Sequence, residues 1–287
     1  MTTPAAARPR AARTARAAPR TARAAPRMTD EELNSLMALL GGVDSTELKV
    51  TVPSASHRDT IQGLPIDPVE SQPRQVYFFD TPDLALNRAG LVVRARRVQG
   101  GKGDTVVKVR PVNPAELSPD MRADASFNVE VDVLPGGYVC SASFKGRSDG
   151  AQIWDAVRGS RPLRKLFSKP QRAFFQLHAP EGIELDSLVP LGPTFCLKGR
   201  FNARMDAGGR TTDRPIVVEM WLYPDGSRIL ELSTKCAPAE TFQVAAETRA
   251  YLAGRGVVLT GVQQTKTRTA LEYYAKQLAK PVGPKGT

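Results

Sequence analysis

The sequence has 287 residues, of which 41% are hydrophobic, so it can bury the core of one large domain or two small ones. It has no run of about 18 apolar residues and no apolar leader, which excludes a spanning helix and a secretory signal, and its three scattered cysteines lack metal-site spacing, so we expect a reduced protein of the cytoplasm. The formal net charge of +11 is typical of proteins that bind nucleic acid or acidic membranes, but most of it lies near the N-terminus.

Residues 1–27 are a basic N-terminal leader. They contain seven arginines and no acid, and the heptad TARAAPR occurs twice in tandem, which predicts disorder. A transit peptide, or a start at Met28, stays open for this leader. The rest of the chain has a charge of only +4, because 33 basic residues remain against 29 acidic ones. We therefore expect no membrane partner and no specific nucleic-acid partner, and we divide the chain into this leader, one domain over residues 28–280 and a tail over residues 281–287.

The first half of the domain reads as one helix followed by strands. Thr29 and Glu32 form a capping-box pattern before an apolar periodic run that stops at Gly41 and Gly42, which predicts an amphipathic helix. A helical turn is predicted over residues 84–89, and Gly-rich residues 100–104 are typical of a hairpin loop. Strands are predicted over residues 46–52, 75–80, 91–98, 105–110 and 127–134.

The second half reads as a mostly helical segment over residues 141–166, then strands, then helices. The strands are predicted over residues 174–177, 194–205, 216–223 and 227–236, and the helices over residues 238–254 and 263–280. About nine short strands with few helices between them do not fit the alternation of a parallel sheet. The pattern favours an α+β protein, mainly β, built on an antiparallel barrel that is covered by helices.

Charged and apolar residues alternate along nearly every predicted strand. Residues two apart on a strand point to the same face, so the valines and leucines share one face and the charges the other. The basic residues of the charged face are Lys49, Arg94, Arg96, Lys108, Arg110, Lys198, Arg200, Arg204 and Lys235, and the acidic ones are Glu47, Glu130, Asp132, Glu219 and Glu231.

This charged face has two interpretations. An exposed polar face is ordinary in antiparallel sheets. However, the C-terminal helices need an apolar surface, and if they cover the Val and Leu face of a closed sheet, the charges line its interior. Charges in a dry interior cost several kcal/mol each, so such a lumen must hold water, ions and an anion. Arginine suits phosphate oxygens, and carboxylates suit Mg²⁺ or Mn²⁺, so the pattern favours a site for polyphosphate and metal.

Several segments resemble the CYTH proteins, the triphosphate tunnel metalloenzymes. Residues 46–50 (TELKV) resemble the second half of the family's opening E-x-E-x-K motif. Residues 77–97 (YFFDTPDLALNRAGLVVRARR) are similar to its Y-F-D-T-x-x-x-x-L-x-x-x-G-x-x-L-R-x-R segment. Residues 130–132 (EVD) and 231–235 (ELSTK) then follow in the family's order.

The resemblance implies a closed eight-stranded antiparallel β-tunnel that binds a small-molecule triphosphate with Mg²⁺ or Mn²⁺. It implies an acidic set for metal and water, namely Glu47, Glu130, Asp132, Glu219 and Glu231. It also implies phosphate-binding residues, namely Lys49, Arg94, Arg96, Lys108, Arg200, Lys235, Lys266 and Arg268, to which the charged face adds Arg110, Lys198 and Arg204. The candidate catalytic residues are Glu130, Asp132 and Lys49, and either of the two acids would orient water.

Two positions depart from the family pattern. Ser45 stands where the opening motif has its first Glu, and Ser233 stands where the last strand has its second acid. Fewer carboxylates predict weaker metal binding, or binding of a single ion. We expect metal-dependent hydrolysis of a triphosphate; a class IV adenylyl cyclase that forms cyclic AMP, and a non-catalytic polyphosphate- or nucleotide-binding module, stay open, as does a homodimer.

Overall fold

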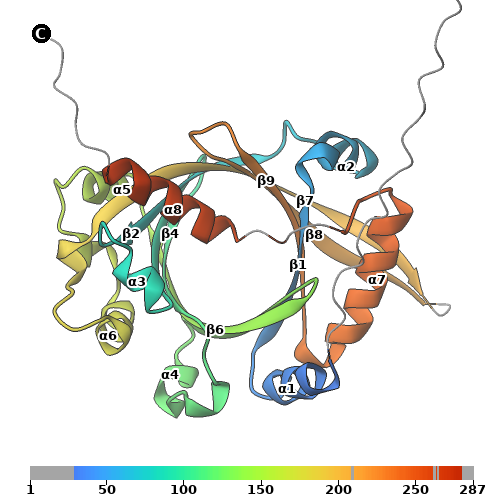
Figure 1. Ribbon diagram of the computed structural model, residues 1–287, viewed down its shortest axis with the longest axis horizontal. Coiled ribbons are helices and arrows are strands. Elements are labelled where there is room, and N and C mark those ends of the chain that lie inside the picture. Colours follow the sequence, from blue (N-terminus) through green and yellow to red (C-terminus); the bar gives the residue numbers. More distant parts are fainter. Residues whose placement is uncertain (1–28, 208–209, 261–262, 264, 280–287) are drawn as a thin grey trace, which may run out of the picture.

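The computed structural model describes residues 29–207, 210–260, 263 and 265–279; the predicted leader and tail lie outside these ranges. Its centre is a closed barrel with the strand order β1-β5-β6-β4-β3-β2-β7-β8-β9 (Figure 1). The strands are β1 (Ser45–Val52), β2 (Gln72–Asp80), β3 (Leu91–Val98), β4 (Gly103–Val109), β5 (Phe127–Leu134), β6 (Gly137–Ser148), β7 (Val189–Ala207), β8 (Arg210–Leu222) and β9 (Arg228–Cys236).

The helices are mostly short. Helix α1 begins as predicted, because the side chain of Thr29 and that of Glu32 cap each other's backbone N–H groups. In the described part of the chain, no helix has the length and apolar character needed to span a membrane. The α-helices are α1 (Asp30–Leu40), α2 (His57–Gly63), α3 (Ala85–Arg88), α4 (Pro119–Ala123), α5 (Gly150–Val157), α6 (Lys169–His178), α7 (Thr241–Gly254) and α8 (Lys266–Leu278).

The barrel has nine strands, one more than the resemblance implied, and one of its pairs is parallel. β1 pairs in parallel with β5, whereas every other neighbouring pair is antiparallel. Strand directions cannot alternate all the way round a closed ring with an odd number of strands, so the ninth strand requires a parallel pair. This pair places Ser45 beside Glu130 and Glu47 beside Asp132.

Strand β6 lies partly where the sequence predicted helix. It is the antiparallel partner of β4 and of β5, and Ala142 and Phe144 are buried on its outer face. Ser141 and Ser143 alternate with them toward the barrel interior. Because the interior positions begin with small serines rather than charges, the charge alternation that marked the other strands is weak here, and the strand was missed.

Helix α6 contains the segment that the sequence predicted as a strand over residues 174–177. Ser168 and Gln171 form a capping box at its start, and Phe174 and Phe175 are both buried. The prediction was wrong because a short apolar run fits a strand as well as a buried helix. Ile153 of α5 joins the same apolar cluster, so these two helices cover the outer face of the barrel around β3, β4 and β6.

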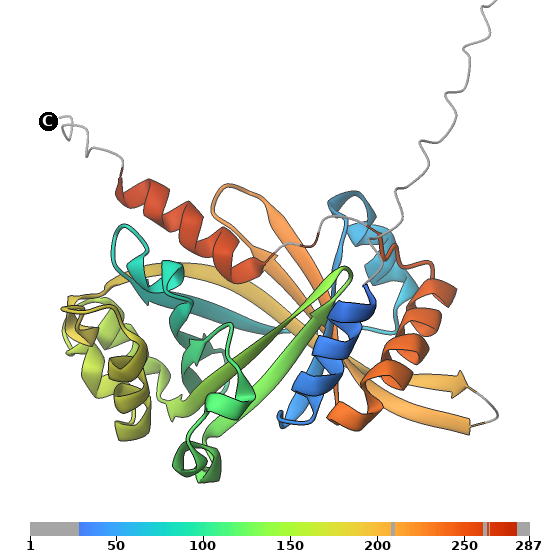
Figure 2. The ribbon, with the colours of Figure 1, turned by 60° about the horizontal axis from the view of Figure 1, so that its bottom comes forward.

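The two C-terminal helices cover different parts of the barrel. Helix α7 lies on the outside, where Val244 and Leu252 pack on outward side chains of the sheet, as expected. Helix α8 instead lies along one edge of the barrel opening (Figures 1 and 2). Its Ala270 and Leu271 pack in one cluster with Val92 and Trp221, which line the interior. The expectation that both helices need the outer apolar face is therefore wrong for α8.

Candidate functional site

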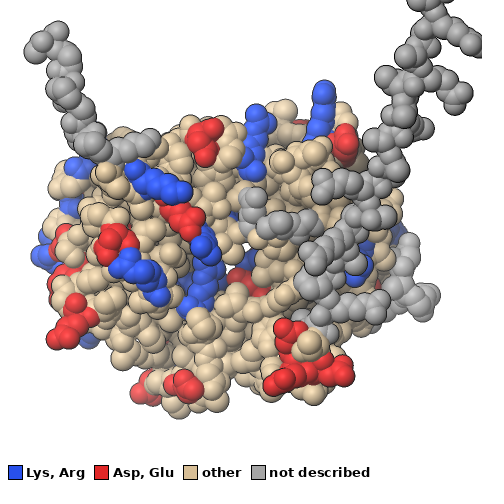
Figure 3. Space-filling view, viewed as in Figure 1, with Lys and Arg blue, Asp and Glu red and all other residues tan. Residues whose placement is uncertain are grey.

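A cavity of about 410 Å³ lies inside the barrel. Figure 3 shows its opening as a hollow near the centre of the face, with basic side chains at one edge and acidic ones within. Nine basic and six acidic residues line it, so its lining is net positive. The basic residues are Lys49, Arg94, Arg96, Lys108, Arg110, Lys145, Lys198, Lys235 and Lys266, and the acidic ones are Glu47, Asp104, Glu130, Asp132, Glu219 and Glu231.

Most of the site residues selected from the sequence line this cavity, and three do not. Arg200 and Arg204 lie on β7 with the same facing as Lys198, but they are exposed beyond the cavity. Figure 2 shows that the β7–β8 hairpin projects past the barrel. Arg268 lies on α8, is 71% exposed and pairs with Glu272. Alternation predicts which face of the sheet a side chain is on, but not how far along a long strand the barrel extends. For this reason the sequence placed the two β7 arginines in the site.

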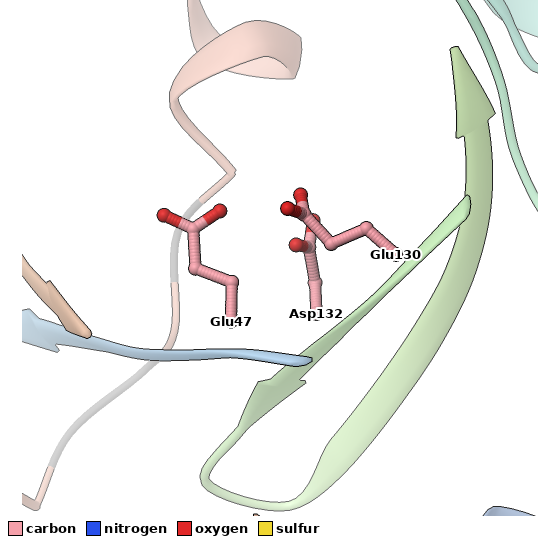
Figure 4. A group of neighbouring side chains, drawn as sticks. All are labelled: Glu47, Glu130 and Asp132. Atoms are coloured by element: carbon pink, nitrogen blue, oxygen red, sulfur yellow. The ribbon is translucent and has the colours of Figure 1, made fainter. Parts of the chain in front are cut away.

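Three carboxylates meet where β1 and β5 pair in parallel. Carboxylate oxygens of Glu47, Glu130 and Asp132 all lie within 4.8 Å of one another (Figure 4). Glu47 comes from β1, and the other two come from alternate positions of β5, so all three point into the cavity. We call these residues the carboxylate trio.

Lysines neutralise the carboxylate trio. Lys49 Nζ lies 3.2 Å from Glu47 Oε2 and 2.9 Å from Asp132 Oδ1. Lys108 Nζ lies 3.8 Å from an oxygen of each β5 acid. Lys235 contacts Glu130 and lies 3.8 Å from Glu47. Three ammonium groups therefore hold three carboxylates together.

Two acids of the trio, Glu47 and Asp132, have a lowered pKa and are ionised near neutral pH. Burial opposes ionisation of Glu47, but the positive charges of Lys49 and Lys235 outweigh it, so its pKa is lowered. Burial likewise opposes ionisation of Asp132, and Lys108 and Lys49 outweigh it and lower the pKa. Three converging carboxylates fit the preference of Mg²⁺ and Mn²⁺ for hard oxygen ligands, and an ion bound there would displace ammonium groups.

The two serines that replace expected acids also face this region. Ser45 Oγ lies 3.4 Å from Glu130 Oε2, and Ser233 pairs in register with Lys49 across β1 and β9. A hydroxyl carries no charge, so neither residue adds attraction for a cation. The structure thus provides three neighbouring carboxylates where the family pattern would provide more.

Glu219 and Glu231 form a second acidic group, separate from the trio. They face each other across β8 and β9. Lys266, at the start of α8, contacts Glu219 and lies 2.6 Å from Glu231 Oε1. Burial opposes both charges, yet the mutual attraction lowers the pKa of Glu219 and raises that of Lys266. This pair ties α8 to the barrel interior.

Trp221 is fixed beside this second group. Its Nε1 donates a hydrogen bond of 3.1 Å to Glu219 Oε2, and Lys266 Nζ lies 5.2 Å from the ring centroid. Only 3% of the residue is exposed. The ring is therefore a packing element of the cavity wall.

An arginine pair lines another part of the cavity wall. Arg96 Nη2 lies 2.6 Å from Asp104 Oδ2, and Arg94 Nη2 lies 3.8 Å from Asp104 Oδ1. Burial, together with the positive charge of Arg96, lowers the pKa of Arg94 to about 10. The buried Nε of Arg94 has no hydrogen-bond acceptor among the described residues. One carboxylate thus interacts with two guanidinium groups, so N–H donors of these arginines are left to bind an anion.

Sequence reasoning missed two charged residues of the cavity. Asp104 lies at the start of β4, in a stretch that the sequence assigned to the hairpin loop. Lys145 lies on β6, which the sequence predicted as helix. The alternation of Ser141, Ser143, Lys145 and Arg147 is the signal that could have identified both the strand and the lysine.

Comparison with known proteins identifies the fold. No family model matches the chain, and no curated protein matches it. Solved structures do match it. Among them are a candidate adenylyl cyclase from Hippeastrum, described as having a dominant triphosphatase activity, and a candidate adenylate cyclase from Bacillus halodurans. The first has a TM-score of 0.57 at 15% identity over 79% of this chain and 95% of its own. The second has a TM-score of 0.50 at 13% identity over 79% and 97%. At such identities the likeness shows the fold alone.

Proposed function

We propose that this chain, which has the triphosphate tunnel fold of the CYTH proteins, is a metal-dependent hydrolase of a triphosphate-bearing substrate. One observation carries the proposal: the cavity inside the barrel combines nine basic side chains with three carboxylates whose oxygens lie within 4.8 Å of one another. The bases suit phosphate oxygens, and the carboxylates suit a hard divalent cation.

The residues divide into three roles. Glu47, Glu130 and Asp132 would hold Mg²⁺ or Mn²⁺, which when bound neutralises charge on the phosphate oxygens. Arg94 and Lys108, with the other cavity bases, bind and orient the phosphate chain. Phosphoryl transfer depends mainly on such positioning and charge stabilisation. Glu130 or Asp132 accepts a hydrogen bond from the attacking water and aligns it with the bond that breaks.

The test is phosphate release from inorganic triphosphate, ATP and thiamine triphosphate, each with Mg²⁺ or Mn²⁺. We expect turnover with at least one substrate, and its loss when EDTA removes the metal. Arg268→Ala is the matched control, because this side chain is exposed outside the cavity and should leave turnover unchanged. No release from any of the three substrates would overturn the hydrolase proposal.

A class IV type adenylyl cyclase is the second candidate, because the Hippeastrum and Bacillus halodurans structures are described as candidate adenylyl or adenylate cyclases. In that reaction the ribose 3′-oxygen of ATP attacks the α-phosphate, cyclic AMP forms and pyrophosphate leaves. The same cavity would hold the triphosphate and metal. Measuring cyclic AMP beside free phosphate separates the two reactions, since the hydrolase forms no cyclic AMP.

A non-catalytic polyphosphate- or nucleotide-binding module is the third candidate, favoured by Ser45 and Ser233. Their hydroxyls stand where acids would strengthen metal binding, while the basic lining is complete. This candidate predicts calorimetric binding of triphosphate without turnover. Gain of turnover in the Ser45→Glu, Ser233→Glu double variant would then identify the missing acids as the cause.

A further inference from the structure

The bases of the cavity differ in whether a carboxylate already neutralises them. Seven of the nine lie within 4.0 Å of a carboxylate oxygen. Arg110 and Lys145 have no ion pair within the described part of the chain. An anion that binds a paired lysine must compete with its carboxylate, whereas these two residues can meet an anion without that competition.

Lys145 lies level with Arg94 on the cavity wall. The register pairs Arg94 of β3 with Val106 of β4, and Val106 with Lys145 of β6. All three side chains line the cavity. Two strand spacings separate the Cα atoms of Arg94 and Lys145 by roughly 10 Å, a gap that two long basic side chains can close around one phosphate.

This level is distinct from the carboxylate trio. Glu130 pairs in register with Ser141 of β6, and Lys145 lies four residues further along that strand, roughly 13 Å away. Lys108 lies between the two levels, because it pairs with Ser143. A phosphate chain with one end at the trio can therefore run past Lys108 to Arg94 and Lys145.

Both residues have unused capacity to bind an anion. The buried Nε of Arg94 has no acceptor among the described residues, and a buried N–H without a partner is costly. Partial burial lowers the pKa of Lys145, with Glu130 opposing that effect, so a nearby anion would stabilise its charged form. Part of the Lys145 side chain remains exposed to solvent, so a ligand can reach it.

We propose that Lys145, together with Arg94, binds the end of the phosphate chain that lies away from Glu47, Glu130 and Asp132, and that Lys145 thereby makes the cavity selective for triphosphate over pyrophosphate. This inference rests on the proposed function, since it assumes that the trio takes the metal-bound end. A pyrophosphate held at the trio is one phosphate shorter and stops before Lys145.

The test is calorimetric binding of inorganic triphosphate and of pyrophosphate, each with Ca²⁺, to the wild type and to Lys145→Ala. Loss of one charge-assisted contact should weaken triphosphate binding about tenfold and change pyrophosphate binding less than about twofold. Lys145→Arg should keep most of the affinity. Lys102→Ala removes an equal charge from the exposed β3–β4 turn and should change neither ligand's affinity.

The outcomes separate this inference from the proposed function. Unchanged triphosphate binding in Lys145→Ala, or equal losses for both ligands, would overturn the selectivity role and leave the hydrolase proposal intact. A selective loss of triphosphate binding in a protein that releases no phosphate with Mg²⁺ or Mn²⁺ would support the role of Lys145 and overturn the hydrolase proposal. Thermal unfolding of each variant confirms that it is folded.

Discussion

The two acidic groups of the cavity are neutralised in different ways. The carboxylate trio is balanced by lysines from the barrel strands, and one of these, Lys235, has a side chain that is 50% exposed. Glu219 and Glu231 are balanced by Lys266, which comes from α8, is 20% exposed and also contacts the ring of Trp221. Under the proposed function, an ion would replace the half-exposed Lys235 beside the first group, whereas Lys266 holds the second group against the packed helix α8.

This difference assigns the two groups different tasks. Three carboxylates within 4.8 Å of one another can share a cation. Glu219 and Glu231 were also metal candidates from the sequence, but they do not belong to this three-residue group. Their shared lysine, Lys266, anchors α8 at the edge of the barrel opening. We therefore expect changes in the trio to affect chemistry most, and changes around Lys266 to affect stability most.

The largest expected effect is on turnover in Glu130→Gln. The variant keeps the size of the side chain but removes its charge from the trio. Metal affinity should therefore fall, and the attacking water should be less well oriented. We expect turnover of the best substrate to fall about 100-fold or more, as for loss of other groups that stabilise a transition state. Phosphate release measures the turnover. Urea denaturation measures the free energy of unfolding, which should change much less than the activation free energy does. A fall of less than about threefold would contradict a catalytic role for the trio.

The next effect is on stability in Lys266→Ala. Removing this ammonium group leaves Glu219 and Glu231 facing each other across two strands with only Lys198 paired to them in the described part of the chain, and its Nζ lies 3.9 Å from Glu219 Oε1. Loss of one partner from a buried ion pair should lower the free energy of unfolding by about 3 kcal/mol, measured by urea denaturation. Arg268→Ala, on the exposed side of the same helix, should change it by less than about 0.5 kcal/mol. Equal effects of the two substitutions would refute the anchoring role.

A smaller effect is expected from adding an acid to the trio. Ser45→Glu places a carboxylate next to Glu130, because the two positions pair in register. A fourth hard ligand should tighten Mn²⁺ binding about tenfold, measured by calorimetry. Ser45→Gln is the matched control of the same size without charge. If both variants bind Mn²⁺ alike, charge at this position does not limit metal affinity.

The smallest effect is expected on stability in Lys235→Ala. This lysine contacts the trio, but its side chain is half exposed, so solvent screens much of its attraction for Glu130 and Glu47. We expect the free energy of unfolding to fall by less than about 1 kcal/mol, again by urea denaturation. A loss as large as that in Lys266→Ala would remove the distinction between the two acidic groups.

The sequence predicted the barrel because its charge alternation is strong on most strands. Glu47 with Lys49, and Glu130 with Asp132, identify the inner face through a period of two. The resemblance to a known family predicted closure and helical cover, and the matching structures confirm the fold. The resemblance implied eight strands where the barrel has nine, and the parallel pair was missed, since a local pattern predicts a strand but not its neighbour in the sheet.

The limits of the site prediction have the same origin. Lys145 was missed because serines precede it on β6, so the segment lacked the pattern of charges. Arg200 and Arg204 were placed in the site because the sequence predicted the face of the sheet on which they lie, but not their position along β7 relative to the cavity. Lys266 lies on a helix, and no strand period could identify it; only the resemblance did. Distances between elements depend on tertiary packing, which a local pattern does not contain.

The parallel pairing of β1 with β5 links ligand binding to the closure of the barrel. β1 pairs with β5 on one side and with β9 on the other, and these strands carry Glu47, the two β5 acids and Lys235. If the barrel opens between β1 and β5, the two β5 acids lose Glu47 and Lys49 of β1 and Lys235 of β9 at once. Of the ion pairs that the structure describes, they keep only those with Lys108 of β4. A bound cation and anion should therefore slow amide hydrogen exchange in β1, β5 and β9 together, so that the three strands are protected as one cooperative unit.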